Sequence, residues 1–273
     1  MMKCESIPMK VNGSMEDARL ELYFLDNFSD IKLEKARATI LICPGGGYEM
    51  TSDREGEAIA IKFLAVGFHV AILRYSVAPV RYPIALLELA GAVKYLRDNA
   101  EEYKIDKDRI IIQGCSAGGH LAASYGVFWR KPFLQEYYNV SEEMLRPNGL
   151  ILNYPVISSG EFAHESSFRM LLGERYEELK EEMSLEKQVN KDVPPVFIWH
   201  TYTDDCVLVE NSLLFVNALR KYNISAEFHM YSKGGHGLGL ANELTVALDG
   251  YGIQRECESW IDLGITWVKA QEK

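Results

Sequence analysis

The chain has 273 residues, of which 48% are hydrophobic and 25% charged, and its mean hydropathy is -0.11. This composition is typical of a globular protein, and the length is sufficient for a large domain with a sizeable core. The net charge of -10 argues against a polyanionic partner such as DNA or RNA, and against binding to an anionic membrane surface. We therefore expect neither a nucleic-acid partner nor a membrane partner.

The sequence shows no secretory or membrane-spanning pattern. The first 23 residues lack the apolar core of a signal peptide, and the longest apolar runs are far too short to cross a bilayer. The cysteines are odd in number and widely scattered, without a C-x-x-C pair: Cys4, Cys43, Cys115, Cys206 and Cys257. This pattern favours free thiols, and hence a cytoplasmic location. The sequence leaves the oligomeric state open, including a homo-oligomer.

Short apolar runs alternate with longer helical patterns along the chain. An edge hairpin is predicted between residues near 3–11 and 18–25. Further strands are predicted at 38–45, 68–75, 109–114, 149–156, 195–200 and 226–232. Helices are predicted at 54–67, 83–103, 207–222 and 251–270. Apolar strands that alternate with helices indicate an α/β protein with a mainly parallel, doubly wound sheet of about eight strands and helices on both faces.

Two helical segments carry apolar stripes. In 251–270 the residues expected on one buried face are Ile253, Cys257, Trp260, Ile261 and Trp267. Residues 158–193 separate two strands by more than a simple crossover needs. Their stripe consists of Phe168, Leu171, Leu172, Tyr176, Leu179 and Met183, with Glu and Lys on the other face. This segment is predicted either to pack on the domain as a helix or to form a small cap over a substrate site, and the two are compatible. No linker divides the chain, so residues 1–273 are interpreted as a single domain.

A candidate nucleophile lies in the segment Gly114–Gly118, which fits the pattern G-x-S-x-G. The pattern alone is common by chance, but its context adds to it. Ser116 follows one predicted strand, Asp204 and Asp205 follow a later one, and His236 follows the last. Open α/β sheets bind ligands at the carboxyl ends of their strands, and the order Ser-Asp-His is that of an α/β hydrolase. The order and the placement together favour a catalytic serine.

The chemistry of acyl transfer explains these residue types. A serine hydroxyl becomes a good nucleophile when an imidazole removes its proton, and a carboxylate then stabilises the imidazolium. The oxyanion that develops needs preorganised N–H donors. We expect these donors at Ala117, directly after the serine, and at Gly46 and Gly47, in a glycine run after the first parallel strand.

Four segments together resemble the α/β-hydrolase esterases of the acetyl-esterase and acetyl-xylan-esterase type: 43–79, 114–124, 195–222 and 231–241. The resemblance implies a triad of Ser116, Asp204 and His236. It also implies oxyanion donors at Gly46, Gly47 and Ala117. The implied activity is hydrolysis of short acyl esters, acetyl foremost, of a small alcohol or sugar, without metal or cofactor. The chain departs from the family pattern at Pro44, where a histidine is commoner, and at Leu208, where proline often stands.

The acid and the substrate contacts need further argument. In the family pattern the acid lies four residues after the strand-terminal histidine and three before a valine. Counting from His200 and back from Val207 selects Asp204 both times. Asp205 is then expected to cap the following helix. His164, in the proposed cap, and Tyr48, after the glycine run, are expected to contact the substrate.

Other readings fit the sequence less well. The segment around Ser116 lacks the G-x-G-x-x-G spacing of a dinucleotide fold and the Gly-Lys-Ser/Thr of a P-loop. The six histidines show no paired ligand spacing for a metal. His69, His200 and His229 lie in predicted strands and are interpreted as structural, and His120 as packed. A non-catalytic binding protein on this fold stays an alternative, as do a lipase, a thioesterase and a peptidase.

Overall fold

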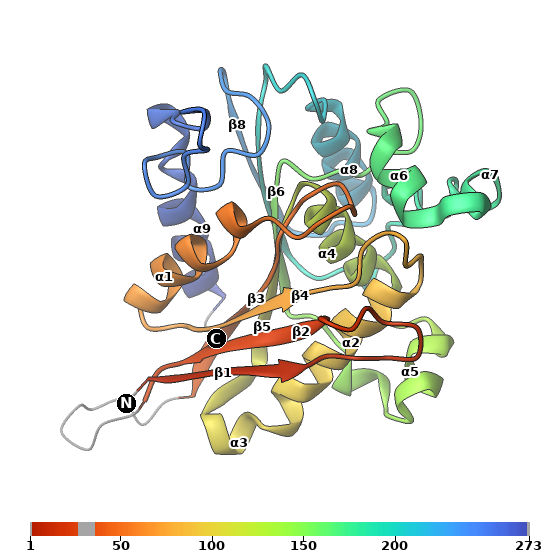
Figure 1. Ribbon diagram of the computed structural model, residues 1–273, viewed down its shortest axis with the longest axis vertical. Coiled ribbons are helices and arrows are strands. Elements are labelled where there is room, and N and C mark those ends of the chain that lie inside the picture. The colour runs from red at the N-terminus through yellow and green to blue at the C-terminus, as the bar shows by residue number, and fades with distance from the viewer. Residues whose placement is uncertain (1, 27–35, 272–273) are drawn as a thin grey trace.

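Eight strands form one sheet in the computed structural model, which describes residues 2–26 and 36–271 (Figure 1). In chain order they are β1 (Lys3–Pro8), β2 (Arg19–Phe24), β3 (Arg37–Cys43), β4 (His69–Arg74), β5 (Ile105–Cys115), β6 (Gly149–Asn153), β7 (Val196–Thr201) and β8 (Ala226–Tyr231). Their order across the sheet is β1-β2-β4-β3-β5-β6-β7-β8. β1 and β2 form an antiparallel edge, and the other six strands are parallel. The sequence-based prediction of a mainly parallel sheet with an edge hairpin is confirmed.

The helices cover both faces of this sheet (Figure 1). One face is covered by α1 (Glu57–Ala65) and α9 (Trp260–Ala270), and the other by α2 (Ile84–Asp98), α4 (Ser116–Phe128) and α8 (Glu210–Lys221). Shorter helices are α3 (Ala100–Tyr103), α5 (Pro132–Tyr138), α6 (Glu165–Leu172) and α7 (Tyr176–Leu179). In β5, Ile110 and Ile112 belong to one core and Ile111 to the other. Burial on both faces explains why the central strands are continuously apolar.

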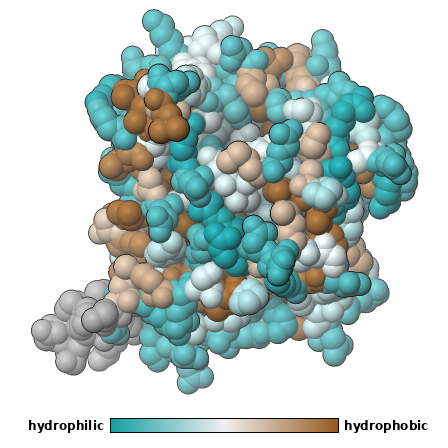
Figure 2. Space-filling model, viewed as in Figure 1, coloured by the Kyte–Doolittle hydropathy of each residue, from teal (hydrophilic) through white to brown (hydrophobic). Residues whose placement is uncertain are grey.

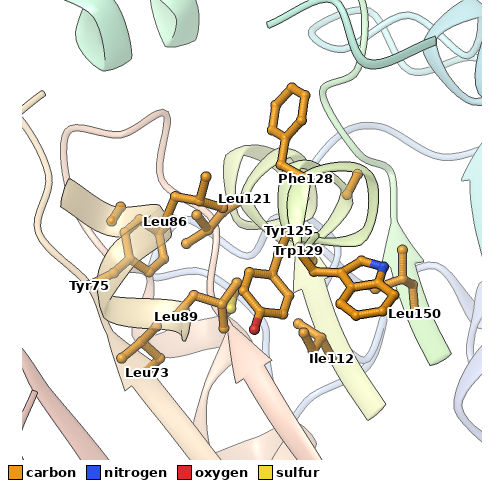
Figure 3. Close-up of a cluster of buried hydrophobic side chains, with 14 of the residues drawn as sticks. Leu73, Tyr75, Leu86, Leu89, Ile112, Leu121, Tyr125, Phe128, Trp129 and Leu150 are labelled. Atoms are coloured by element: carbon orange, nitrogen blue, oxygen red, sulfur yellow. The ribbon is translucent and has the colours of Figure 1, made fainter. Parts of the chain in front are cut away.

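Helix α4 lies at the centre of the larger core, and all 13 of its residues are buried. Figure 3 shows Tyr125 and Phe128 of this helix, and Trp129 directly after it, in one buried cluster with Leu86 and Leu89 of α2. Ile112 of β5 and Leu150 of β6 lie in the same cluster (Figure 3). Such close packing fixes the helix as a rigid body. Ser116, the first residue of α4, is therefore held in a fixed position.

The segment 158–193 contains α6, α7 and short 3₁₀ turns rather than one continuous helix. Every residue of its predicted apolar stripe is nevertheless buried. In Figure 1 this segment lies at the upper right, beyond α4. Its placement agrees with packing on the domain. Most of its Glu and Lys residues are exposed, whereas Glu186 accepts hydrogen bonds from the buried Ser158 and Ser184.

The C-terminal helix differs from its prediction. It begins at Trp260 instead of 251, and Ile253 is exposed rather than part of the buried face. The loop before α9 displays further exposed apolar residues at Leu244, Leu248 and Tyr251. Figure 2 shows a hydrophobic cluster at the upper left, within an otherwise mixed surface. Among the helices of the described residues, none is both long and apolar enough to cross a membrane.

Candidate active site

Ser116 occupies a strained turn between β5 and α4. Its φ of 53° lies in the left-handed region, which non-glycine residues seldom adopt. A Cβ on Gly114 would lie 2.2 Å from the carbonyl oxygen of Gly118, and one on Gly118 would lie 2.1 Å from that of Cys43. Both positions therefore require glycine, because the backbones of the strand, the turn and the helix touch directly. This is the geometry of a nucleophile elbow.

Ser116, His236 and Asp204 form one hydrogen-bonded triad. His236 Nε2 lies 2.7 Å from Ser116 Oγ, and its Nδ1 lies 2.7 Å from Asp204 Oδ2. A carboxylate only accepts hydrogen bonds, so His236 Nδ1 carries the hydrogen and donates it to Asp204. Nε2 is then free to accept the hydroxyl hydrogen of Ser116. The triad is therefore arranged for proton transfer from the serine to the imidazole.

Asp204 is held by several donors at once. Its Oδ1 accepts the backbone N–H groups of Cys206 and Val207, each at 3.0 Å. Its Oδ2 accepts His236 and, at 3.2 Å, also His200 Nε2. Burial alone raises the pKa of Asp204, but the hydrogen bonds to the two histidines outweigh burial and hold this pKa well below its usual value. The carboxyl group therefore stays ionised at neutral pH.

The helix-capping role expected for Asp205 is wrong. Helix α8 begins at Glu210, its cap residue is Val209, and no side chain caps it. Asp205 is exposed. The turn that follows β7 is closed by Asp204 itself, which accepts the N–H groups two and three residues further on. A single aspartate thus binds the imidazole and also orders its own loop.

The glycine run lies beside the serine. A Cβ on Gly45 would come within 2.9 Å of Ser116 Cβ. Gly46 has a φ of 128°, and a Cβ there would lie 2.3 Å from the carbonyl oxygen of Met50. Within the described residues, the N–H groups of Gly46, Gly47 and Ala117 have no protein acceptor. Unpaired amides next to a nucleophile suit the binding of an oxyanion.

The two residues expected to contact the substrate occupy different positions. Tyr48 is only 2% exposed, and its hydroxyl lies 2.9 Å from His120 Nδ1, so we assign it a structural role instead. His164 directly precedes α6 and is half-buried, with its Nδ1 2.8 Å from Ser167 Oγ. Burial and the nearby His236 lower the pKa of His164. His164 is thus neutral at neutral pH and lies close to the triad.

Two buried side chains of the site were not predicted from the sequence. Glu55 is 4% exposed and accepts the N–H of Gly45 at 2.7 Å. Tyr154, directly after β6, donates its hydroxyl to Glu55 at 2.7 Å, and its ring lies edge-on to that of His236. No local pattern marks either residue, because Glu55 lay within the helix predicted at 54–67 and Tyr154 within the strand predicted at 149–156.

The other histidines differ in their surroundings. His120 is buried, with Nε2 3.0 Å from the carbonyl oxygen of Met183. His200 is buried between Ser212 and the acid loop, and His69 is buried at the start of β4. Among the described residues, no three His, Cys, Asp or Glu side chains gather as a metal site would require. The packed interpretation of His120 is confirmed.

Comparison with known proteins decides the family. The profile of the BD-FAE family matches residues 25–219, more than half of the sequence. The chain belongs to the BD-FAE family. Endo-1,4-beta-xylanase B of Butyrivibrio fibrisolvens is 40% identical over 76% of this chain, and acetylxylan esterase of Xylanibacter ruminicola is 29% identical over 72%. The chain spans only 33% and 40% of the lengths of these two curated relatives.

Solved structures of similar length show the same fold as this BD-FAE member. The acetyl ester-xyloside bifunctional hydrolase of Caldicellulosiruptor lactoaceticus has a TM-score of 0.81 at 34% identity, with 97% of this chain and 96% of that one covered. The carboxylesterase Cest-2923 of Lactobacillus plantarum has a TM-score of 0.84 at 27% identity, with 99% and 98% covered. The predicted α/β-hydrolase fold is confirmed.

The buried His120 makes stability depend on pH. Burial lowers the pKa of His120 from 6.5 to about 4. Between these values the unfolded chain binds a proton that the folded chain does not, so the free energy of unfolding falls as the pH drops through this window. His120 alone accounts for a loss of up to about 3 kcal/mol at full protonation. We expect urea unfolding of wild type at pH 7, 6, 5 and 4.5 to show this loss.

A glutamine in place of His120 removes the titrating group. His120→Gln should be less stable than wild type at pH 7, because the contacts of the imidazole with Tyr48 and Met183 change. Its free energy of unfolding should nevertheless decline less steeply below pH 6.5. An equal decline in variant and wild type would contradict the assignment of a neutral, buried imidazole.

Proposed function

We propose that this chain is a serine carboxylesterase that removes short acyl groups, acetyl foremost, from a small alcohol or a sugar. The observation that carries the proposal is the triad of Ser116, His236 and Asp204 at 2.7 Å spacings, next to three amides that have no acceptor in the described part of the chain. A nucleophile, a general base, an orienting acid and an oxyanion site are the complete requirements of acyl transfer.

In the proposed acylation step, Ser116 Oγ attacks the ester carbonyl carbon while its proton passes to His236 Nε2. The electron pair of the carbonyl bond moves onto oxygen, where the amides of Gly46, Gly47 and Ala117 bind the negative charge. Asp204 stabilises the imidazolium. Collapse of this intermediate expels the alcohol oxygen, which takes the proton from His236 and leaves an acyl-serine.

Water completes the proposed cycle. His236 removes a proton from a water molecule, which attacks the acyl carbon and forms a second tetrahedral intermediate in the same oxyanion site. Expulsion of Ser116 Oγ, which regains its proton from His236, releases the carboxylic acid. Aspartate 204 stays ionised throughout, in agreement with its depressed pKa.

The relatives support the proposed substrate class. One curated relative is an acetylxylan esterase, and one structural neighbour is an acetyl ester-xyloside bifunctional hydrolase. The segment 158–193 adds a physical argument, since its outer face carries Glu and Lys rather than the broad apolar lid that a long acyl chain would favour. We propose that this segment is a small cap on a single hydrolase domain.

We also propose a cytoplasmic location. All five cysteines lie in the described part of the chain, and all five are free thiols, two of them exposed. Exposed free thiols favour a reducing compartment. The net charge of -10 repels polyanions, so we propose a small ester rather than a polyanion as the substrate in this compartment.

The choice between the two aspartates can be tested by amide substitution. Asp204→Asn should lower kcat by about 10³ to 10⁴, because an amide no longer holds the correct imidazole tautomer. Asp205→Asn serves as the matched control, and we expect it to retain most activity, with stability changed by less than about 0.5 kcal/mol. Hydrolysis of p-nitrophenyl acetate measures both. An inactive Asp205→Asn with an active Asp204→Asn would shift the assigned acid by one residue.

The acyl preference tests the proposed function itself. With p-nitrophenyl esters of two to eight carbons, we expect kcat/KM to be highest for acetyl and to fall steeply toward octanoyl. Ser116→Ala should lose about 10⁴ in activity or more, and should no longer be labelled by a fluorophosphonate probe. A kcat/KM that rises to eight carbons would favour a lipase. A wild-type chain that neither hydrolyses esters nor reacts with the probe would favour a non-catalytic binding protein.

We propose that His164 contacts the alcohol side of the substrate, since it is half-buried and close enough to His236 for that residue to lower its pKa. His164→Ala should then raise KM for an acetylated sugar several-fold, with a smaller effect on p-nitrophenyl acetate, whose alcohol part offers fewer hydrogen bonds. The exposed neighbour Glu161→Ala is the control. Equal changes in both substrates would remove His164 from the substrate site.

A further inference from the structure

A second buried carboxylate, Glu55, lies behind the candidate active site. It ends a short 3₁₀ turn, Asp53–Glu55, that follows the glycine run. Each of its oxygens has one partner. Oε2 accepts the N–H of Gly45, and Oε1 accepts the hydroxyl of Tyr154, both at 2.7 Å. A buried carboxylate without hydrogen-bond partners would cost free energy of folding, and these two hydrogen bonds offset that cost.

Tyr154 extends this contact to the loop of His236. Its hydroxyl oxygen accepts the N–H of Gly239 at 3.0 Å, so its hydrogen is directed to Glu55. The ring centres of Tyr154 and His236 lie 5.1 Å apart with the planes at 72°, a favourable edge-to-face arrangement. One carboxylate is therefore connected to the glycine loop directly and to the histidine loop through a single tyrosine.

We propose that Glu55 is a positioning residue that aligns the oxyanion loop and the histidine loop with Ser116. The proposal rests on the esterase function proposed above. Glu55 touches neither the substrate nor the reacting atoms. It acts through the backbone of Gly45, which directly precedes the donor Gly46, and through Tyr154 against the imidazole.

The position of Gly45 explains why this alignment matters. A Cβ on Gly45 would lie 2.7 Å from the carbonyl oxygen of Cys115 and 2.6 Å from Glu55 Oε2. The loop is thus pressed between the elbow and the carboxylate. A shift of the loop redirects the following N–H groups relative to the oxyanion, and misplacement by about 1 Å can cost about 10²-fold in rate.

Glutamine is the sharpest substitution, because it keeps the size of the side chain. Its one oxygen cannot occupy both positions. If it accepts the hydroxyl of Tyr154, the NH₂ group faces the N–H of Gly45, and if it accepts that N–H, the hydroxyl of Tyr154 loses its acceptor. We expect Glu55→Gln to lower kcat about 10-fold to 100-fold with KM nearly unchanged, as for a weakened oxyanion site. Tyr154→Phe breaks the same connection from the other end and should also lower kcat rather than raise KM.

A second buried acid supplies the matched control. Glu88 of α2 is fully buried and accepts hydrogen bonds from Ser14 and Ser76, with no contact to the glycine loop. Glu88→Gln should lower Tm to a similar extent as Glu55→Gln but leave kcat of the folded protein within about two-fold of wild type. This comparison separates positioning from a general loss of packing.

The readout is p-nitrophenyl acetate hydrolysis, with Tm measured on the same preparations. A trifluoromethyl ketone, which accepts Ser116 Oγ at its carbonyl carbon and carries an oxyanion, should bind Glu55→Gln more weakly in proportion to the loss in kcat/KM. Folded Glu55→Gln with wild-type kcat and wild-type ketone affinity would overturn the proposal. So would a loss of kcat in Glu88→Gln equal to that in Glu55→Gln. Failure of the proposed function is distinct, since wild type itself would then lack activity and fluorophosphonate labelling.

Discussion

The candidate site depends on a contact between backbones that only glycine allows. Gly114 of β5 lies against the backbone of α4, and Gly118 of α4 lies against the end of β3. At both positions a Cβ would overlap a carbonyl oxygen. This contact lets Ser116 adopt its strained φ while the remainder of α4 is buried in the core. The free energy of a large apolar core thus holds one unfavourable backbone conformation in place. The nucleophile is fixed by packing, and the other groups of the site are arranged around it.

Much of this arrangement could be predicted from the sequence, for a definite physical reason. Parallel strands covered on both faces are continuously apolar, so their ends are sharp, and the carboxyl ends of such strands meet at one edge of the sheet. Residues 116, 204 and 236 each follow one of these ends, and their proximity follows from the topology. The choice of Asp204 over Asp205 came from the family pattern, counted from His200 and back from Val207, and Asp204 is the aspartate that contacts His236. Their catalytic roles stay predictions until the variants are measured.

The sequence did not reveal the contact of Glu55, and two other predictions made from it were wrong. Glu55 contacts Tyr154, which is 99 residues away, and nothing in the pattern around either residue indicates this contact. Ile253 was assigned to a buried helical face, but the chain forms a loop there and α9 begins only at Trp260. The capping role of Asp205 failed because α8 begins only at Glu210, five residues further on, and its cap residue is Val209. The contact of Glu55 is tertiary, whereas the other two errors concern where a helix begins, which local propensity determines only approximately.

The site therefore combines two kinds of support. Ser116 is positioned by apolar packing, whereas the loops that face it are held by hydrogen bonds from side chains to backbone. Thr201 and Thr203 each donate a hydroxyl hydrogen to the carbonyl oxygen of Gly234, two residues before the histidine. Asp204 and Glu55 bind the N–H groups of their own loops in the same way. A hydrogen bond contributes only about 1 kcal/mol net to stability, far less than the core. Substitutions that break these polar connections can therefore misalign the site while the fold survives.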